Sequence, residues 1–182
     1  MIDLTPKLFI APTIALAIAG VCYVYNLNRA IHKLLFEKFM VAMSSIGFAV
    51  NFTWETLHAP LYQGHHYTIS SFSILALASV ADAIMIILLY FIFSLILKDP
   101  YWVRTLSMLR ILCLVLVGGT GAAVSEVLHI NAGDWTYAAT MPIIPVANVG
   151  ISPVLQFMIV PLLVYWASLF LLRGKSDSNL TS

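Results

Sequence analysis

The chain has 182 residues, of which 61% are apolar and only 9% are charged, and its formal net charge is +1. An ordinary soluble domain carries roughly 25% charged residues, so the composition excludes that class and favours a membrane protein. The sequence contains no nucleotide-binding glycine loop, no nucleophile motif and no nucleic-acid signature, so we expect no nucleic-acid partner.

Apolar runs of about 18 residues or more are long enough to cross a bilayer as helices. Five such runs predict an all-α integral membrane bundle of five transmembrane helices in one domain, residues 1–173. The predicted spans cover about 8–25, 39–59, 71–97, 103–129 and 152–172. Pro60 ends the second span, and Ser152-Pro153 is a favourable start for the fifth. A polar tail, 174–182, is predicted to be disordered.

The first apolar run has an alternative interpretation as a secretory signal peptide, because Ala-Leu-Ala at 15–17 resembles a cleavage site. The flanking charges argue against this interpretation. Only Lys7 precedes the run, whereas Arg29, Lys33 and Lys38 follow it. We therefore expect a retained first span.

The distribution of basic residues predicts the orientation. With five spans, eight of the nine lysines and arginines fall on one side of the membrane: Arg29, Lys33, Lys38, Lys98, Arg104, Arg110, Arg173 and Lys175. Basic residues favour the cytoplasmic side. We therefore expect the N-terminus outside and the C-terminus inside. A resemblance described below adds the expectation of a bacterial inner (plasma) membrane.

The loops predicted to lie outside contain no lysine or arginine, and four of the five histidines lie in or beside them. The segment 131–150 is too interrupted by proline to span and too apolar for disorder, so we expect it to cap the outer surface. It contains Trp135 and Tyr137. An alternative role for these two side chains is to anchor the protein at the membrane interface.

Ionisable groups inside membrane spans are energetically unfavourable and mark candidate functional sites. At 1.5 Å per residue, Glu55 and Glu126 lie roughly 6 Å below the outer helix ends, and Asp82 lies roughly 16 Å deep. Asn51 shares a helical face with Glu55, and Gln156 lies about one turn into the fifth span. We expect these five side chains to line one pocket that opens outward.

No basic residue is predicted in the outer half of the bundle to neutralise these carboxyls. Burial then favours the protonated form, and a protonated carboxyl in an apolar pocket can act as a general acid. The first hypothesis is therefore an enzyme that transfers protons on an apolar, isoprenoid-like membrane lipid and needs no cofactor. Glu55 and Asp82 would be acid and base, and Trp54, Trp135 and Tyr137 would stabilise a cationic intermediate.

A second hypothesis follows from two Glu-x-x-His motifs, Glu55 with His58 and Glu126 with His129. This spacing puts both side chains of each pair on one helical face, as in di-iron and di-manganese bundles. Asp82 could supply one further ligand, but a fourth carboxylate is missing. This pattern would indicate a membrane oxidoreductase dependent on iron or manganese.

A third hypothesis is a protein without catalytic activity, such as a small-ligand binder, a transporter or an accessory subunit. Its carboxyls would bind protons or ligands, while Asn51 and Gln156 would join helices by hydrogen bonds. The sequence contains no pair of inverted repeats, which argues against a transporter.

The motif Asn51-x-x-Trp54-Glu55 resembles a Trp-Glu pair in an early helix of small membrane-embedded terpene cyclases from fungal meroterpenoid and indole-diterpene pathways and their bacterial relatives. Those cyclases usually have seven spans and pair the glutamate with a distant aspartate to protonate an alkene or epoxide. The resemblance implies that Glu55 is the acid, with Asp82 or Glu126 as its partner.

A longer set of motifs resembles a group of small bacterial multi-pass membrane proteins without an assigned reaction. The shared features are Asn51-x-x-Trp54-Glu55, Pro60-Leu61-Tyr62, Ser125-Glu126, Trp135-x-Tyr137, Met141-Pro142 and Ser152-Pro153-x-x-Gln156. This resemblance implies a bacterial membrane protein and names no substrate.

Overall fold

The structure, a computed structural model, describes the backbone of residues 10–178 and the side chains of residues 10–172. Five long helices form the fold, and each contains a stretch long and apolar enough to cross a membrane. They are α1 (Ile10–Arg29), α2 (Lys33–His58), α3 (Ile69–Leu97), α4 (Met108–Ala132) and α5 (Ile151–Ser178). This confirms the predicted all-α class and the five apolar spans.

Short elements connect the helices. Two 3-10 turns are present, η2 (Ala59–Leu61) after α2 and η3 (Trp102–Thr105) before α4. The segment between α4 and α5 contains an antiparallel hairpin of β1 (Ile143–Ile144) and β2 (Val149–Gly150). The predicted cap 131–150 therefore begins within the last turn of α4 and contains a small sheet.

The three largest differences from the predicted helix boundaries are at α4, α2 and α5. The fourth helix begins at Met108 rather than near 103, because η3 occupies the start of the apolar run and the Ser107 hydroxyl caps α4 by accepting the Arg110 N–H. The second helix begins at Lys33, six residues before the predicted span. The last helix continues to Ser178, into the predicted tail, and residues 8–9 and 179–182 lie outside the described residues.

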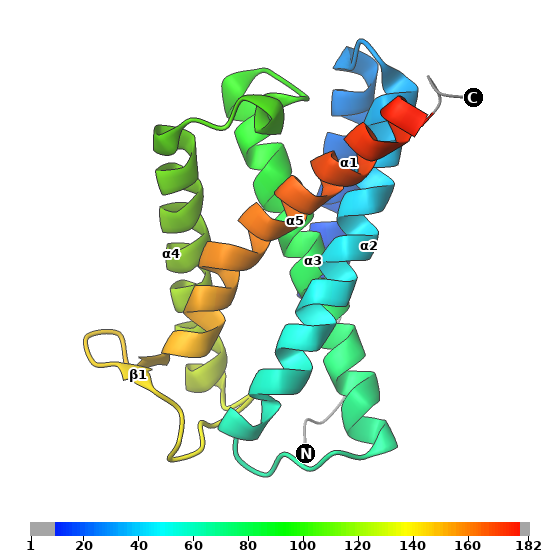
Figure 1. The fold of residues 1–182 in the computed structure, drawn as a ribbon. Helices are drawn as coiled ribbons and strands as arrows, with labels where there is room; N and C mark the ends of the chain where they lie inside the picture. Colours follow the sequence, from blue (N-terminus) through cyan, green and yellow to red (C-terminus); the bar gives the residue numbers. More distant parts are fainter. Residues whose placement is uncertain (1–9, 179–182) are drawn as a thin grey trace.

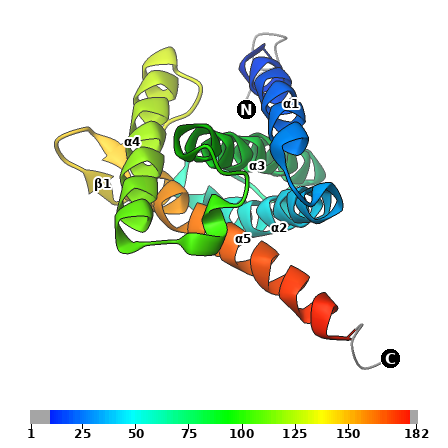
Figure 2. The ribbon, with the colours of Figure 1, turned by 90° about the horizontal axis from the view of Figure 1, so that it is seen from above.

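The five helices have two distinct ends. We call the end with residues 59–68 and 133–150 the hairpin end, and the end with residues 30–32 and 98–107 the basic end. The two ends lie at the bottom and top of Figure 1, and α5 crosses the bundle diagonally between them. It packs on α4 near its start and on α2, and Figure 2 shows it running outward past α2. Helix α3 packs between α1 and α2.

The part of the bundle next to the basic end has a dense aromatic core. Tyr90, Trp102 and Tyr165 are completely buried and contact one another through their rings. The Trp102 indole donates to the Tyr90 carbonyl (3.1 Å), and the Tyr165 hydroxyl donates to the Ile86 carbonyl (2.7 Å). These polar atoms are satisfied within the core, as buried polar groups usually are. This half of the bundle therefore acts as a rigid support.

Charge is distributed unequally between the two ends. All six lysines and arginines with described side chains lie next to the basic end: Arg29, Lys33, Lys38, Lys98, Arg104 and Arg110. At the hairpin end the described ionisable side chains are carboxyls, histidines and tyrosines. The carboxyls in that half of the bundle are consequently far from any described lysine or arginine.

Candidate functional site

A buried glutamine on α5 contacts polar side chains from two other helices, α2 and α3. Gln156, near the start of α5, lies with its Nε2 atom 3.0 Å from Asn51 Oδ1, 3.3 Å from Glu55 Oε1 and 2.9 Å from Asp82 Oδ2. Asn51 is 0% exposed and Gln156 is 2% exposed. We call these four residues the carboxyl cluster. The sequence predicted that all four side chains line one pocket. In the structure, Gln156 contacts each of the other three.

The face of α2 that carries the cluster residues packs against α3 and α5. Asn51 and Glu55 lie one turn apart on α2, so both face the same direction. Gly47, one turn earlier, lies on this packed face, where a Cβ atom would make ordinary contact with the Ala83 Cβ at 3.7 Å. The Asn51 amide donates back to the Gly47 carbonyl (2.8 Å), which fixes its carbonyl oxygen toward Gln156. Asp82 precedes Ala83 and enters the cluster from α3.

The number of donors in the cluster is limited. An amide NH2 group carries two hydrogens, so Gln156 can satisfy two of the three oxygen atoms around it. The carboxyls of Glu55 and Asp82 both contact the same Gln156 Nε2 atom, which holds them close to each other. Two like charges at such short range repel each other, so the arrangement favours a proton on one of the two carboxyls. The pair can therefore hold one acid and one base side by side.

A second polar group holds the long connection at the hairpin end. Glu126 on α4 accepts hydrogen bonds from the Tyr137 hydroxyl and from the Trp135 indole (3.3 Å). The Tyr137 hydroxyl in turn accepts the Gly150 N–H (2.9 Å). We call Glu126, Trp135 and Tyr137 the loop clamp, because they tie residues 135–150 to α4. Glu126, which was expected to line one pocket with Asp82, has its Oε2 bonded to the loop, and among the described residues no hydrogen bond joins it to the carboxyl cluster.

Tyr62 lies between the carboxyl cluster and the loop clamp. Backbone hydrogen bonds pair its segment with the loop, from Gln63 to Thr136 and from Ala138 to Leu61. Its ring packs beside three aromatic side chains. The distances between ring centroids are 5.5 Å to His58, 5.6 Å to Tyr137 and 6.2 Å to Trp135. Burial raises the pKa of the Tyr62 phenol above its ordinary value, and the carboxyls of Glu126 and Glu55 raise it further. Tyr62 therefore remains a neutral phenol within electrostatic range of both groups.

Tyr62 was not among the residues predicted for the site. Its position directly after Pro60-Leu61 was noted only as part of a motif. Helical periodicity does not identify a site residue that follows the end of a helix. The only signal in the sequence was an aromatic residue between two histidines, His58 and His65. The bonds between the two connections at the hairpin end bring Tyr62 beside Tyr137, and they are not visible in the sequence.

The two Glu-x-x-His pairs do not form a common metal site. His58 Nε2 lies 3.7 Å from Glu55 Oε2, whereas His129 Nδ1 bonds Asp134 Oδ2 at 2.6 Å. Across residues 10–172, no group of three or more His, Cys, Asp or Glu side chains is arranged to hold a metal ion. The donor set therefore does not fit the iron or manganese pair of the second hypothesis.

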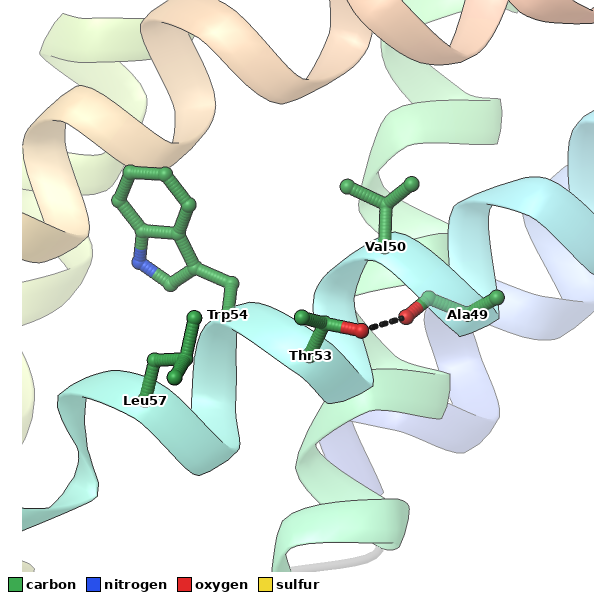
Figure 3. Close-up of a pocket in the computed structure, with 5 residues that line it drawn as sticks. All are labelled: Ala49, Val50, Thr53, Trp54 and Leu57. Carbon is green, nitrogen blue, oxygen red and sulfur yellow. Dashed lines mark hydrogen bonds between the residues drawn. The ribbon is translucent and has the colours of Figure 1, made fainter.

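Trp54 lies on a neighbouring face of α2 and lines a shallow groove with four other residues of that helix. The groove has a volume of about 300 Å³ and is bounded by Ala49, Val50, Thr53, Trp54 and Leu57. Figure 3 shows the Trp54 ring rising from α2 toward α5. Of the three aromatic residues predicted to stabilise a cation, Trp54 is thus beside an open space, whereas Trp135 and Tyr137 hold Glu126.

Comparisons of this chain with protein-family models, with curated proteins and with solved structures find no match. A proposal for the function of the chain therefore depends on the chemistry and the placement of its own side chains.

Proposed function

We propose that this chain is an integral membrane protein with its hairpin end outside and its basic end in the cytoplasm. Five helices of sufficient length and apolar character support the insertion. The six described lysines and arginines beside the basic end support the orientation, because basic residues favour the cytoplasmic side. The resemblance to small bacterial membrane proteins supports a bacterial plasma membrane.

Within this bundle, the proposed activity is enzymatic proton transfer on an apolar, isoprenoid-like lipid. The observation that carries the proposal is the contact of Gln156 Nε2 with both Glu55 and Asp82, which holds two carboxyls together without a lysine or arginine beside them among the described residues. A carboxyl pair that shares one proton is the arrangement that acid–base enzymes use to keep an acid and a base in one site.

The acid and the base have different surroundings. Asp82 receives the shorter Gln156 bond, 2.9 Å, and a donated hydrogen bond favours the carboxylate form. Glu55 has the longer bond, 3.3 Å, and its side chain remains 15% exposed, so it can meet a substrate. The proposed roles are therefore Glu55 as the proton donor and Asp82 as the acceptor. The resemblance of Asn51-x-x-Trp54-Glu55 to terpene cyclases supports the same assignment.

The reaction is balanced without a cofactor. Glu55 gives its proton to one carbon of a C=C bond, which forms a C–H bond and leaves a carbocation at the other carbon. Asp82 then removes a proton from a carbon next to the cation, and a C=C bond forms again. The proton passes from Asp82 back to the neighbouring Glu55 carboxylate, which restores the starting state of the pair. The product is an isomer or a ring-closed form of the substrate. The face of the Trp54 ring can stabilise the cation during this step.

The test is a lipid analysis of the host strain lacking the gene and of the same strain carrying variants. Glu55→Gln and Asp82→Asn should each lower product formation by about 100-fold or more, the usual contribution of a general acid or base. Glu37→Gln removes a carboxyl from the same helix at the basic end and should leave the product unchanged.

Two results would overturn the assignment. Full product formation in both Glu55→Gln and Asp82→Asn would exclude proton transfer by these groups. A lipid profile that does not change when the gene is deleted, together with no conversion of geranylgeraniol, polyprenols or C40 polyenes by the purified protein, would favour a binder, transporter or accessory subunit instead.

A further inference from the structure

The groove on α2 has almost entirely apolar walls. Ala49, Val50 and Leu57 offer only hydrocarbon, and the Thr53 hydroxyl donates to the Ala49 carbonyl (2.9 Å), as Figure 3 shows. The groove lies within the apolar span of α2 and is open to its surroundings. In a membrane, these surroundings are the hydrocarbon chains of lipids. At about 300 Å³ it reaches the lower limit of volumes that hold small-molecule ligands.

The Trp54 side chain, which lines the groove, has one polar atom without a partner. Its Nε1 is buried, so it is not exposed to the groove, and it has no hydrogen-bond acceptor among the described residues. A buried donor without an acceptor is destabilising, and tryptophan indoles usually find a partner when they are buried. The indole N–H is therefore a vacant hydrogen-bond donor beside a hydrocarbon-lined groove. This combination fits a ligand that is mostly hydrocarbon and carries an oxygen atom.

Trp54 stands between the groove and the carboxyl cluster. One residue corresponds to a rotation of about 100° around a helix, so three residues fall about 60° short of a full turn. Trp54 is three residues after Asn51, which belongs to the cluster, and three residues before Leu57, which lines the groove. It consequently lies midway around α2 between the two. A movement of this one side chain would connect them.

We infer that a lipid with a long apolar chain and a single oxygen acceptor enters from the bilayer through this groove, displaces the Trp54 ring and bonds its indole N–H. Trp54 is then the residue that selects an oxygen-bearing isoprenoid over a plain hydrocarbon. The inference names the substrate class and entry route of the carboxyl cluster, so in that respect it rests on the proposed function. The binding itself can be measured without turnover.

The experiment uses the full-length protein with 15N-labelled tryptophan in phosphatidylcholine nanodiscs. The chain has four tryptophans, so four indole signals are expected, and Trp54→Phe assigns one of them. Addition of geranylgeraniol, a C20 isoprenoid alcohol, should shift the Trp54 indole proton to higher frequency and reach saturation. Phytane, a C20 hydrocarbon without oxygen, should not produce this shift.

Three variants serve as controls. Ala49→Phe fills the groove without touching the indole and should weaken the response to geranylgeraniol at least about fivefold. Ala17→Phe places the same ring on an exposed position of α1 and should leave the response unchanged. Glu55→Gln should keep the shift, since binding at Trp54 does not require the carboxylic acid.

The outcomes separate this inference from the proposed reaction. Absence of a saturable shift, an equal shift with phytane, or an unchanged response in Ala49→Phe would overturn the Trp54 site, even if Glu55→Gln abolishes product formation. A saturable shift together with full product formation in Glu55→Gln and Asp82→Asn would support the binding site and reject the acid–base assignment.

Discussion

Gly118 on α4 lies directly against the backbone carbonyl of Phe157 on α5, so closely that a Cβ atom at position 118 would be 2.2 Å from that oxygen. Pro161, four residues after Phe157, has no N–H to donate to this carbonyl. The closest approach of α4 therefore coincides with a missing hydrogen bond in α5. Glycine is needed here because neither backbone can move aside in the way that a flexible side chain can.

Gly118→Ala should destabilise the protein because the new methyl group meets the Phe157 carbonyl. Overpacking of this kind costs about 1–3 kcal/mol, and the better helix propensity of alanine recovers up to about 1 kcal/mol. The matched control is Gly121→Ala, since an added Cβ there meets nothing within 4 Å and should stabilise the helix slightly. The free energy of unfolding in mild detergent is measured for both variants. Equal stability of the two variants would contradict the close contact.

Gln156→Leu should destabilise the protein by about 1–3 kcal/mol, the usual effect of leaving buried acceptors without a donor. Replacing Asp82 by Asn in the same chain should restore part of the loss, because the new amide can donate to Glu55. Gln63→Leu makes the same chemical change in an exposed loop and should shift stability by no more than about 0.5 kcal/mol. If Asp82→Asn gives no recovery in the Gln156→Leu background, the donor role of Gln156 is wrong.

The helices and one face of the site could be predicted because they depend on periodicity within a single segment. Long apolar runs identify the spans, and the i, i+4 spacing of Asn51 and Glu55 puts them on one face of α2. The start of α4 could not be found this way, since Val103 and Leu106 continue the apolar run into the helix that follows. Only the Ser107 cap marks the boundary.

The relation between helices was harder to predict. Spacing shows that Glu126 and His129 share a face of α4, but it does not show that both side chains bond residues 134–137. The rotation of α4 depends on its glycine contact with α5 and on the loop that returns over it. Of the five polar residues expected to lie together, hydrogen bonds in the structure join only the four contributed by α2, α3 and α5.

Tyr137→Phe should loosen the hairpin without unfolding the helices, because it removes the hydroxyl that joins Glu126 to the Gly150 N–H. We expect amide exchange of residues 143–150 to increase by about tenfold, which corresponds to about 1.4 kcal/mol. Hydrogen–deuterium exchange with mass spectrometry measures it. Tyr67→Phe removes a hydroxyl from the other connection and should leave these amides unchanged; an equal change in both variants would contradict a specific clamp.

The same clamp predicts a pH dependence. Burial, followed by the hydrogen bond to Glu126, raises the pKa of Tyr137 above its ordinary value of 10.0. A group whose pKa is raised in the folded state stabilises the fold fully below its unfolded pKa and loses this contribution as pH rises toward the folded pKa. The difference in exchange of residues 143–150 between the native chain and Tyr137→Phe should therefore stay constant below about pH 10 and diminish above it, as exchange in the native chain accelerates. A change in this difference near pH 7 would contradict this assignment.

The orientation can be tested with two exposed apolar residues at opposite ends. Val146 in the hairpin is 100% exposed, and Ile31 between α1 and α2 is 86% exposed. Each is replaced by cysteine in a chain whose two native cysteines, Cys22 and Cys113, are changed to serine. A membrane-impermeant maleimide should label Val146→Cys on intact cells and label Ile31→Cys only after the cells are permeabilised. The opposite pattern would reverse the topology and place the groove beside Trp54 in the cytoplasmic leaflet, because that groove lies in the half of α2 next to the hairpin end.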